Sequence, residues 1–330
     1  MMDTPYRKVC IYGAGAIGAW MGARLGQAGC TVSVVARGAT LQALQQHGLR
    51  CELDGRTLAT PVRASAAPAE LGVQDLVIIA VKAPALPDVA RQIAPLLGPH
   101  TVVLTAMNGV PWWFLAGFGG ACEGRPLQSI DPQGEIATAI PARHVIGCVV
   151  HASCSLAGPG HAQHHFGNRL IVGEPSGQST GRVQQLVALL ARAGFETELS
   201  PQIQKDIWYK LWGNMTVNPV SALTGATTDL ILDDPLVRDF ISRVMVEARD
   251  IGARIGIPIA QQPEDRHAVT RKLGAFKTSM LQDVEAGRPV ELDALVTVVQ
   301  ELGRMTGVPT PSTDTLLGLA RLHARVRGLY

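Results

Sequence analysis

The chain has 330 residues, of which 47% are apolar and 17% are charged. It is too long for one ordinary hydrophobic core and too apolar for a disordered protein, so we expect about two packed domains. The 29 Lys and Arg residues nearly balance the 27 Asp and Glu residues, which gives a formal net charge of +2. This balance creates no strong field for collecting nucleic acid or anionic lipid, so neither is expected as a partner.

The apolar stretches of the chain are short. None reaches the roughly 18 to 20 residues that cross a bilayer, because charged residues, glycine or proline interrupt every candidate. The amino-terminal residues also lack the basic region and the cleavage site of a signal peptide. We therefore expect a soluble, cytoplasmic protein.

Cysteine and histidine are the residues that would indicate a disulfide framework or a metal site. The 6 cysteines include no C-x-x-C pair, so we expect reduced structural thiols. His161, His164 and His165 cluster in a segment flanked by glycine and proline, without the spacing that a catalytic metal site usually shows. No metal is expected.

The first half of the chain alternates short β-rich runs with helical stretches, which is typical of a parallel sheet covered by helices. The runs at 75–81 and 101–105 are almost continuously apolar, as expected where both faces of a sheet are buried. The full set of expected elements comprises strands at 8–12, 31–36, 75–81, 101–105, 145–155 and 169–172, helices at 16–27 and 181–193, and a turn at 158–160.

Beyond residue 200 the pattern changes to helices alone. They are expected at about 201–222, 235–254, 263–286, 290–306 and 313–326, with proline and glycine marking several of their ends. We therefore predict an α/β fold class, with a sheet domain over residues 1–200 and an all-helical domain over 201–330.

The first expected strand leads into a glycine-rich turn, Gly13-Ala14-Gly15-Ala16-Ile17-Gly18, which opens the first expected helix. In a G-x-G-x-x-G turn, the first glycine permits the tight turn, the second lets a pyrophosphate approach the backbone, and the third brings the helix against the strand. The helix N-terminal N–H groups then face the phosphates. The position between strand and helix favours a dinucleotide site over a turn that only packs.

The end of the second strand indicates which dinucleotide binds. NAD-selective sites place an acid there for the ribose 2′-hydroxyl, whereas an arginine attracts a 2′-phosphate. This strand carries no acid and ends at Arg37, so we expect NADPH/NADP+, the alternative being that Arg37 is a solvated loop residue. Residues 1–200 are therefore predicted to form a Rossmann-type NADP-binding domain. Lys82 follows the strand at 75–81, where it either contacts phosphate or ribose or is a plain surface lysine.

Three polar residues, Lys210, Asn214 and Asn218, recur every fourth residue in an apolar helix and therefore share one face. Asparagine is a poor helix former because its amide competes for backbone groups, so two at this spacing need a reason. One reason is catalysis: hydride transfer to a ketone leaves an alkoxide, which a protonated lysine can polarise and protonate. On this interpretation the helices over 201–330 form the substrate and catalytic domain. The alternative is a solvated Lys210 and a helix that ends at Asn218 before Pro219.

A second polar group lies downstream, where Ser279 and Glu291 flank a break at Gly287-Arg288-Pro289. The break allows Glu291 to begin a new helix near Ser279. A carboxylate there would favour the charged form of Lys210, and serine or asparagine can bind substrate oxygens without adding charge. For Glu291 alone, stabilisation by the helix dipole is the alternative explanation.

At these residues the chain resembles the ketopantoate reductase family. The resemblance covers nearly the whole chain and rests on GAGAIG at 13–18, VK at 81–82, NG at 108–109, K-x3-N-x3-NP at 210–219, and SMLQD at 279–283 with a Glu twelve residues after its Ser. It implies NADPH-dependent reduction of a 2-oxo acid, ketopantoate to pantoate, on the route to pantothenate and coenzyme A. The roles it implies are catalytic acid for Lys210, substrate binding and orientation for Glu291, binding of substrate oxygens for Asn214, Asn218 and Ser279, NADPH binding for Arg37 and Lys82, and a place near nicotinamide and substrate for Asn108.

Two departures from well-studied members leave the substrate open. Thr228 and Phe276 stand where such members can have asparagine, so a less polar pocket is expected. Pro111-Trp112-Trp113-Phe114 either packs in the core or reshapes that pocket. A more apolar 2-oxo acid is therefore one alternative, and a non-catalytic NADP(H)-sensing protein is another. The apolar helices beyond residue 200 can cover one another or a neighbouring subunit, and a homodimer is expected.

Overall fold

The computed structural model describes residues 5–117 and 119–330, which form two compact units. Unit 1 contains the described residues of Met1–Met107, Ala116–Phe118 and Gly134–Ile203, and unit 2 contains Asn108–Leu115, Gly119–Gln133 and Gln204–Tyr330. The predicted domain boundary lies at residue 200, whereas this division groups 108–115 and 119–133 with the helices that follow residue 203. Part of the reason is Glu301, whose carboxylate accepts hydrogen bonds from the backbone N–H groups of Gln128 and Ser129 at 2.7 and 2.8 Å.

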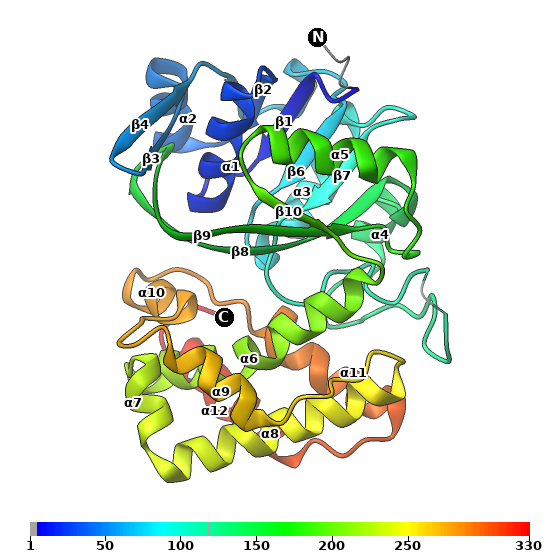
Figure 1. Cartoon of the computed structure of the whole chain (residues 1–330), viewed down its shortest axis with the longest axis vertical. Coiled ribbons are helices and arrows are strands. Elements are labelled where there is room, and N and C mark those ends of the chain that lie inside the picture. Colours follow the sequence, from blue (N-terminus) through cyan, green and yellow to red (C-terminus); the bar gives the residue numbers. More distant parts are fainter. Residues whose placement is uncertain (1–4, 118) are drawn as a thin grey trace. The chain divides into compact units, whose positions relative to one another are not determined.

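Unit 1 is built on a sheet of ten strands among the described residues (Figure 1). Its order is β4-β3-β9-β8-β7-β6-β1-β2-β5, and β10 pairs with β9. β1 lies between β2 and β6 and is parallel to both, so the strand order reverses there, and ligands of such sheets bind beyond the carboxyl ends at that point. The strands are β1 (Lys8–Tyr12), β2 (Thr31–Val35), β3 (Leu49–Leu53), β4 (Arg56–Thr60), β5 (Arg63–Ser65), β6 (Leu76–Ile79), β7 (Val102–Thr105), β8 (Val145–Gly158), β9 (His161–Gly173) and β10 (Glu196–Leu199).

Helices cover the sheet of unit 1. α1 (Ala16–Gln27) and α5 (Gly181–Arg192) lie on one face, where their apolar residues join alternate residues of the strands in one core cluster (Figure 1). All residues of β6 and β7 are buried, which confirms the expectation that both faces of these strands are covered. The remaining α-helices of this unit are α2 (Gly38–His47), α3 (Leu86–Gln92) and α4 (Glu135–Ala139).

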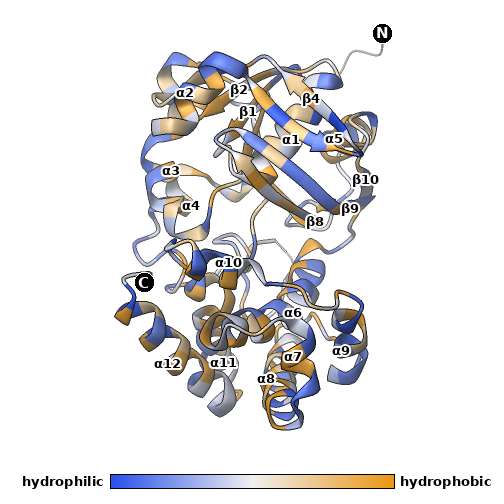
Figure 2. Cartoon of the chain, turned by 90° about the vertical axis from the view of Figure 1, so that its left-hand side faces the viewer, coloured by the Kyte–Doolittle hydropathy of each residue, from blue (hydrophilic) through white to orange (hydrophobic). Residues whose placement is uncertain are grey.

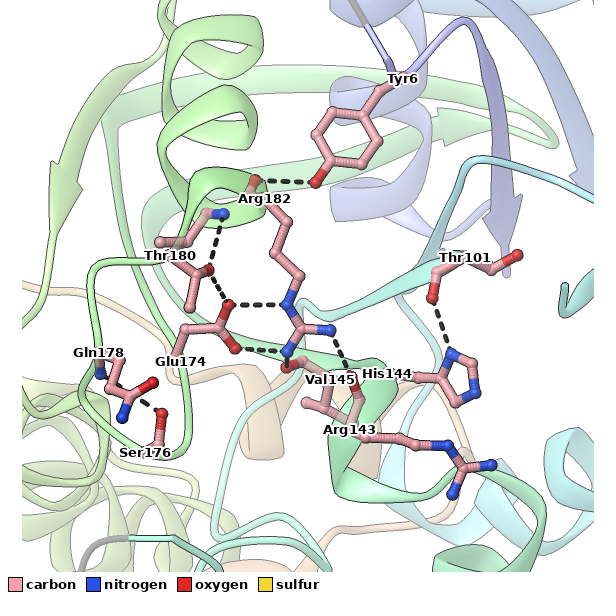
Figure 3. A network of polar contacts seen from close by, with 11 residues as sticks. Tyr6, Thr101, Arg143, His144, Val145, Glu174, Ser176, Gln178, Thr180 and Arg182 are labelled. Carbon is pink, nitrogen blue, oxygen red and sulfur yellow. Dashed lines mark hydrogen bonds and ion pairs between the residues drawn. The ribbon is translucent and has the colours of Figure 1, made fainter. Parts of the chain in front are cut away.

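An ion pair between a buried carboxylate and a half-buried guanidinium holds the start of α5 against the sheet (Figure 3). Glu174, directly after β9, is 3% exposed, and its carboxylate accepts hydrogen bonds from Nε and Nη2 of Arg182 and from the hydroxyl of Thr180, the N-cap of α5. The Arg182 guanidinium also donates to the backbone carbonyls of Arg143 and Val145 at the start of β8. Because the carboxylate of Glu174 is fully hydrogen-bonded, the cost of burying its charge is offset, and three elements are fixed together.

Unit 2 consists of helices and loops, and no strand occurs among its described residues. Buried residues recur along α8 at helical spacing, and hydrophobic and hydrophilic residues alternate along it in Figure 2. None of the helices in the described chain has both the length and the apolarity needed to cross a membrane. The helices are α6 (Ile203–Thr224), α7 (Thr228–Asp233), α8 (Pro235–Arg254), α9 (Pro263–Arg271), α10 (Ser279–Glu285), α11 (Val298–Thr306) and α12 (Pro311–Val326), with a π-helical turn over Asp293–Thr297.

One predicted helix is wrong. The stretch 263–286 forms two helices, α9 and α10, separated by a loop in which Gly274 has φ +63°. Thr228 holds this loop, since its N–H donates to the Phe276 carbonyl at 3.0 Å and its hydroxyl to the Gly274 carbonyl at 2.7 Å. The helix α10 then begins with its own N-cap, Thr278, whose hydroxyl accepts from the N–H of Leu281 at 3.2 Å.

Several elements were missed by the sequence analysis. They are the hairpin β3–β4, whose turn places Asp54 at φ +50° and Gly55 at φ +72°, and the elements α2, α3, α4, β5, α7 and β10. The strand predicted at 169–172 is the end of the much longer β9. Short or edge elements of this kind have weak periodicity, because few of their residues are buried.

Candidate active site

The glycine turn lies between β1 and α1, as predicted. Gly13 has φ +99°, and an added Cβ would lie 2.6 Å from Cγ1 of Val81 and 3.2 Å from the Ala80 carbonyl oxygen. At Gly18 an added Cβ would lie 2.1 Å from the Gly13 carbonyl oxygen, so helix and strand approach too closely for any side chain. Gly15 is the N-cap of α1, and neither a capping side chain nor an acid occupies the first turn. The backbone N–H groups there therefore suit a phosphate group.

Two basic residues share the sheet edge with this turn. Because β1, β2 and β6 are adjacent and parallel, Gly13, Arg37 and Lys82 follow strand ends on the same edge of unit 1. Arg37 has a side chain 63% exposed, with Nη2 3.4 Å from Oδ2 of Asp88. The hydrogen bonds from Arg91 and then Arg37 hold the pKa of Asp88 below its ordinary value. An exposed pair of this length contributes little, so Arg37 can exchange Asp88 for a phosphate.

In unit 2, Lys210 on α6 is hydrogen-bonded to Asn108. The Nζ of Lys210 donates to Oδ1 of Asn108 at 2.8 Å. Lys210 and Asn214 are half-buried and Asn218 is buried. The two residues in contact are distant in the sequence, and the structure brings them together within one unit.

The opposite face of α6 anchors this helix. Trp208, Trp212 and Met215 are almost completely buried, and the indole N–H of Trp212 donates to the Met245 carbonyl at 2.7 Å. The helix continues through Pro219 to Thr224, so the alternative that it ends at Asn218 is wrong. The polar face thus projects from a helix that is fixed by its apolar face.

A close backbone contact positions the loop that carries Asn108. Gly109 has φ +81°, and an added Cβ would lie 2.5 Å from the carbonyl oxygen and 2.7 Å from the Cβ of Ala294. The N–H of Val110 donates to the same carbonyl oxygen at 2.9 Å. Ala294 belongs to the π-helical turn that follows Glu291, and such turns are frequent at functional sites. The sequence analysis named Asn108 and Glu291 but had no signal for this contact.

The segments that carry Asn218, Ser279 and Glu291 pack against one another in unit 2. Ser279 is the exposed first residue of α10, and Glu291 is 8% exposed. Their apolar neighbours in the sequence line one small pocket. These lining residues are Pro219, Met280, Val290 and Leu292.

The aromatic run after Asn108 belongs to the core. Trp112, Trp113 and Phe114 are 7%, 2% and 0% exposed, and the rings of Phe114 and Trp208 have centroids 6.0 Å apart. Core packing, one of the two predicted alternatives, is therefore the outcome. Thr228 is 2% exposed and Phe276 is half-buried.

The clustered histidines and the cysteines are placed in unit 1. Nε2 of His161 lies 2.9 Å from Oε1 of Glu52, and the other two histidines of the cluster have partners on β8 and β9. All six cysteines are free. Burial raises the pKa of Cys10 and of Cys154 to about 12, so neither thiol is a ready nucleophile.

Unit 1 has a mostly parallel sheet with a glycine turn at the point where the strand order reverses, and unit 2 presents a lysine–asparagine pair. These features together define a dinucleotide-dependent oxidoreductase. The family described as "Ketopantoate reductase PanE/ApbA" matches residues 9–177, and its "C terminal" part matches residues 202–324. The chain therefore belongs to the ketopantoate reductase family, whose members are nicotinamide-dependent oxidoreductases that act on CH–OH groups.

Individual relatives agree with this assignment. The chain is 46% identical to a 2-dehydropantoate 2-reductase of Mesorhizobium japonicum, over 98% of this chain and 99% of the relative. A crystal structure of a candidate ketopantoate reductase from Ralstonia solanacearum shares 61% identity and a TM-score of 0.94, covering 98% of this chain and 99% of that one. A D-mandelate dehydrogenase shares the fold, with a TM-score of 0.83 at 21% identity over 98% of this chain and 100% of that one.

Proposed function

We propose that this chain reduces ketopantoate to pantoate with NADPH, and that Lys210 is the general acid. The observation that carries the proposal is the hydrogen bond from Nζ of Lys210 to Oδ1 of Asn108, made by a helix whose apolar face is locked in the core. The name of the Mesorhizobium relative supports the substrate. In this proposal unit 1 holds the cofactor and unit 2 the substrate. A homodimer and a cytoplasmic location remain predictions.

The glycine turn at 13–18 fits a dinucleotide, because side chains are excluded at Gly13 and Gly18 and no side chain caps the N–H groups at the start of α1. Arg37 would bind the 2′-phosphate of NADPH, with Lys82 at the same sheet edge. A guanidinium at this place favours NADPH over NADH because it offers paired donors to the extra phosphate. When bound, the cofactor supplies the hydride.

The proton comes from this chain. Asn108 accepts one N–H of the Lys210 ammonium and so directs its remaining donors. As the substrate oxygen gains negative charge, the ammonium stabilises it and transfers one proton, which leaves a neutral amine that solvent reprotonates. We assign the binding and orientation of the substrate to Asn214, Asn218, Ser279 and Glu291.

A second candidate is the same reaction on a more apolar 2-oxo acid. Thr228 is 2% exposed and donates its hydroxyl to the Gly274 carbonyl at 2.7 Å, so it offers no hydrogen-bond donor to a substrate. The half-buried ring of Phe276 follows in the same loop. Both features reduce the polarity available to a substrate and favour an alkyl or aryl substituent.

The experiment is a comparison of Lys210→Met with Lys205→Met, a matched control on the same helix whose side chain is exposed. NADPH oxidation is followed with ketopantoate, a branched-chain 2-oxo acid and phenylglyoxylate. We expect Lys210→Met to lower kcat by about 10²- to 10⁴-fold, with NADPH binding retained, and Lys205→Met to leave kcat unchanged.

Each other outcome has a defined meaning. Full kcat in Lys210→Met removes this lysine from the mechanism. A higher kcat/KM for phenylglyoxylate than for ketopantoate selects the second candidate. Tight NADPH binding without turnover of any 2-oxo acid supports an NADP(H)-sensing protein and contradicts the proposed reaction.

A further inference from the structure

Arg266 of unit 2 is a half-buried cation that the reaction above leaves without a role. Its guanidinium lies 5.8 Å from the ring centroid of Tyr209 on α6. Burial lowers the pKa of Arg266, and the nearby Tyr209 opposes this shift. In the described part of the chain no carboxylate pairs with Arg266, and its Nε is buried without a hydrogen-bond partner. The next residue, His267, fixes α9 to α8, because its Nε2 lies 2.9 Å from the Ser242 hydroxyl.

A glycine inside α6 makes the space for this guanidinium. An added Cβ at Gly213 would lie 2.8 Å from both Nε and Nη2 of Arg266 and 2.9 Å from its Cζ. Glycine weakens a helix interior, and a desolvated charge without a partner is unfavourable. These two unfavourable features occur at one point, where the guanidinium of Arg266 has no counter-charge among the described residues.

The guanidinium lies beside the polar face of α6. Residues three apart are neighbours on a helix surface, with Cβ atoms about 5–6 Å apart, so Gly213 adjoins Lys210. At 100° per residue, Gly213 and Asn214 lie on opposite sides of Lys210. Arg266 therefore flanks the proposed proton donor on the side that the asparagines leave open.

We propose that Arg266 binds the carboxylate of the 2-oxo acid beside Lys210 and so determines specificity for a free acid over a neutral ketone. Arginine pairs with a carboxylate through two parallel hydrogen bonds. A 2-oxo acid carries its carbonyl and its carboxylate on adjacent carbons, which matches a proton donor and a guanidinium on neighbouring positions. This inference rests on the proposed function, because it concerns the same substrate.

The test compares a 2-oxo acid with its primary amide, which keeps the carbonyl and the carbon skeleton but loses the charge. Arg266→Met keeps most of the side-chain volume. We expect it to lower kcat/KM for the acid about tenfold to a hundredfold, mainly through KM, and to leave kcat/KM for the amide unchanged. Arg266→Lys should restore part of the preference. Arg243→Met is the control, because Arg243 is exposed and stacks on a ring, that of Phe240, at 5.9 Å.

Three outcomes overturn the inference. Equal losses on acid and amide would show a structural role for Arg266, and a loss confined to the KM for NADPH would assign its charge to the cofactor. If Arg266→Met does not fold, Gly213→Ala displaces the guanidinium while it retains the charge, and an unchanged acid-to-amide ratio there overturns the inference. If the wild type reduces 2-oxo acids but the Arg266 variants keep the wild-type ratio of kcat/KM for acid and amide, only this inference is contradicted. A wild-type protein that reduces none contradicts the proposed function as well.

Discussion

Replacing Gly109 with alanine tests whether the contact with Ala294 holds Asn108 beside Lys210. Gly109 has φ +81°, which costs an alanine about 1–2 kcal/mol. Its new Cβ would also lie 2.5 Å from the carbonyl oxygen and 2.7 Å from the Cβ of Ala294. Neither atom is the end of a flexible side chain, so the backbone must move, and such overpacking typically costs another 1–3 kcal/mol or so. We expect the free energy of unfolding to fall by about 2–5 kcal/mol in total.

Gly307→Ala is the matched control. Gly307 has φ +71° at the end of α11, and an added Cβ there meets nothing within 4 Å. This variant therefore reports the backbone conformation alone, with an expected loss of about 1–2 kcal/mol. The difference between the two variants measures the overlap with Ala294.

Urea denaturation gives the free energies, and steady-state NADPH oxidation gives kcat. The movement that relieves the overlap displaces Oδ1 of Asn108 from Nζ of Lys210, and a misplacement of about 1 Å in an active site can lower the rate about 10²-fold. We expect this loss of kcat in Gly109→Ala and an unchanged kcat in Gly307→Ala. Equal stability losses in the two variants, together with equal kcat values, would refute the reasoning.

Two further predictions concern stability. Glu174→Gln leaves the guanidinium of Arg182 without its buried partner and should lower the free energy of unfolding by about 3–5 kcal/mol. Glu198→Gln breaks the half-exposed pair with Arg169 and should lower it by no more than about 1 kcal/mol. The urea midpoints of the two variants should therefore differ clearly, and similar midpoints would contradict the burial assigned to Glu174. Burial lowers the pKa of His267 below its ordinary value of 6.5, so its neutral form is favoured in the folded state. The contribution of His267 to the free energy of unfolding is therefore fully present above about pH 6.5 and is lost as the pH falls through the folded pKa. His267→Gln should flatten the dependence of the free energy of unfolding on pH in this range. If the variant and the wild type show the same pH dependence, His267 does not cause the loss of stability at low pH.

The sequence by itself determined the nucleotide-binding half of the fold and the polar face of α6. The bounds of β1 and α1 are those predicted, because a buried run followed by a glycine turn and an apolar helix is a local pattern. Lys210, Asn214 and Asn218 could likewise be placed on one face of α6, since helical periodicity alone puts them there. The family resemblance rested on these same local motifs.

Only the tertiary structure decided what these local elements contact. The contact of Gly109 with Ala294 and the place of Arg266 over Gly213 each join segments far apart in the chain, and periodicity within one element carries no signal for such pairs. The break between α9 and α10 depends on hydrogen bonds from Thr228, which lies well before either helix. A local pattern specifies which face of an element is apolar, but the partner of that face is selected by packing over the whole unit.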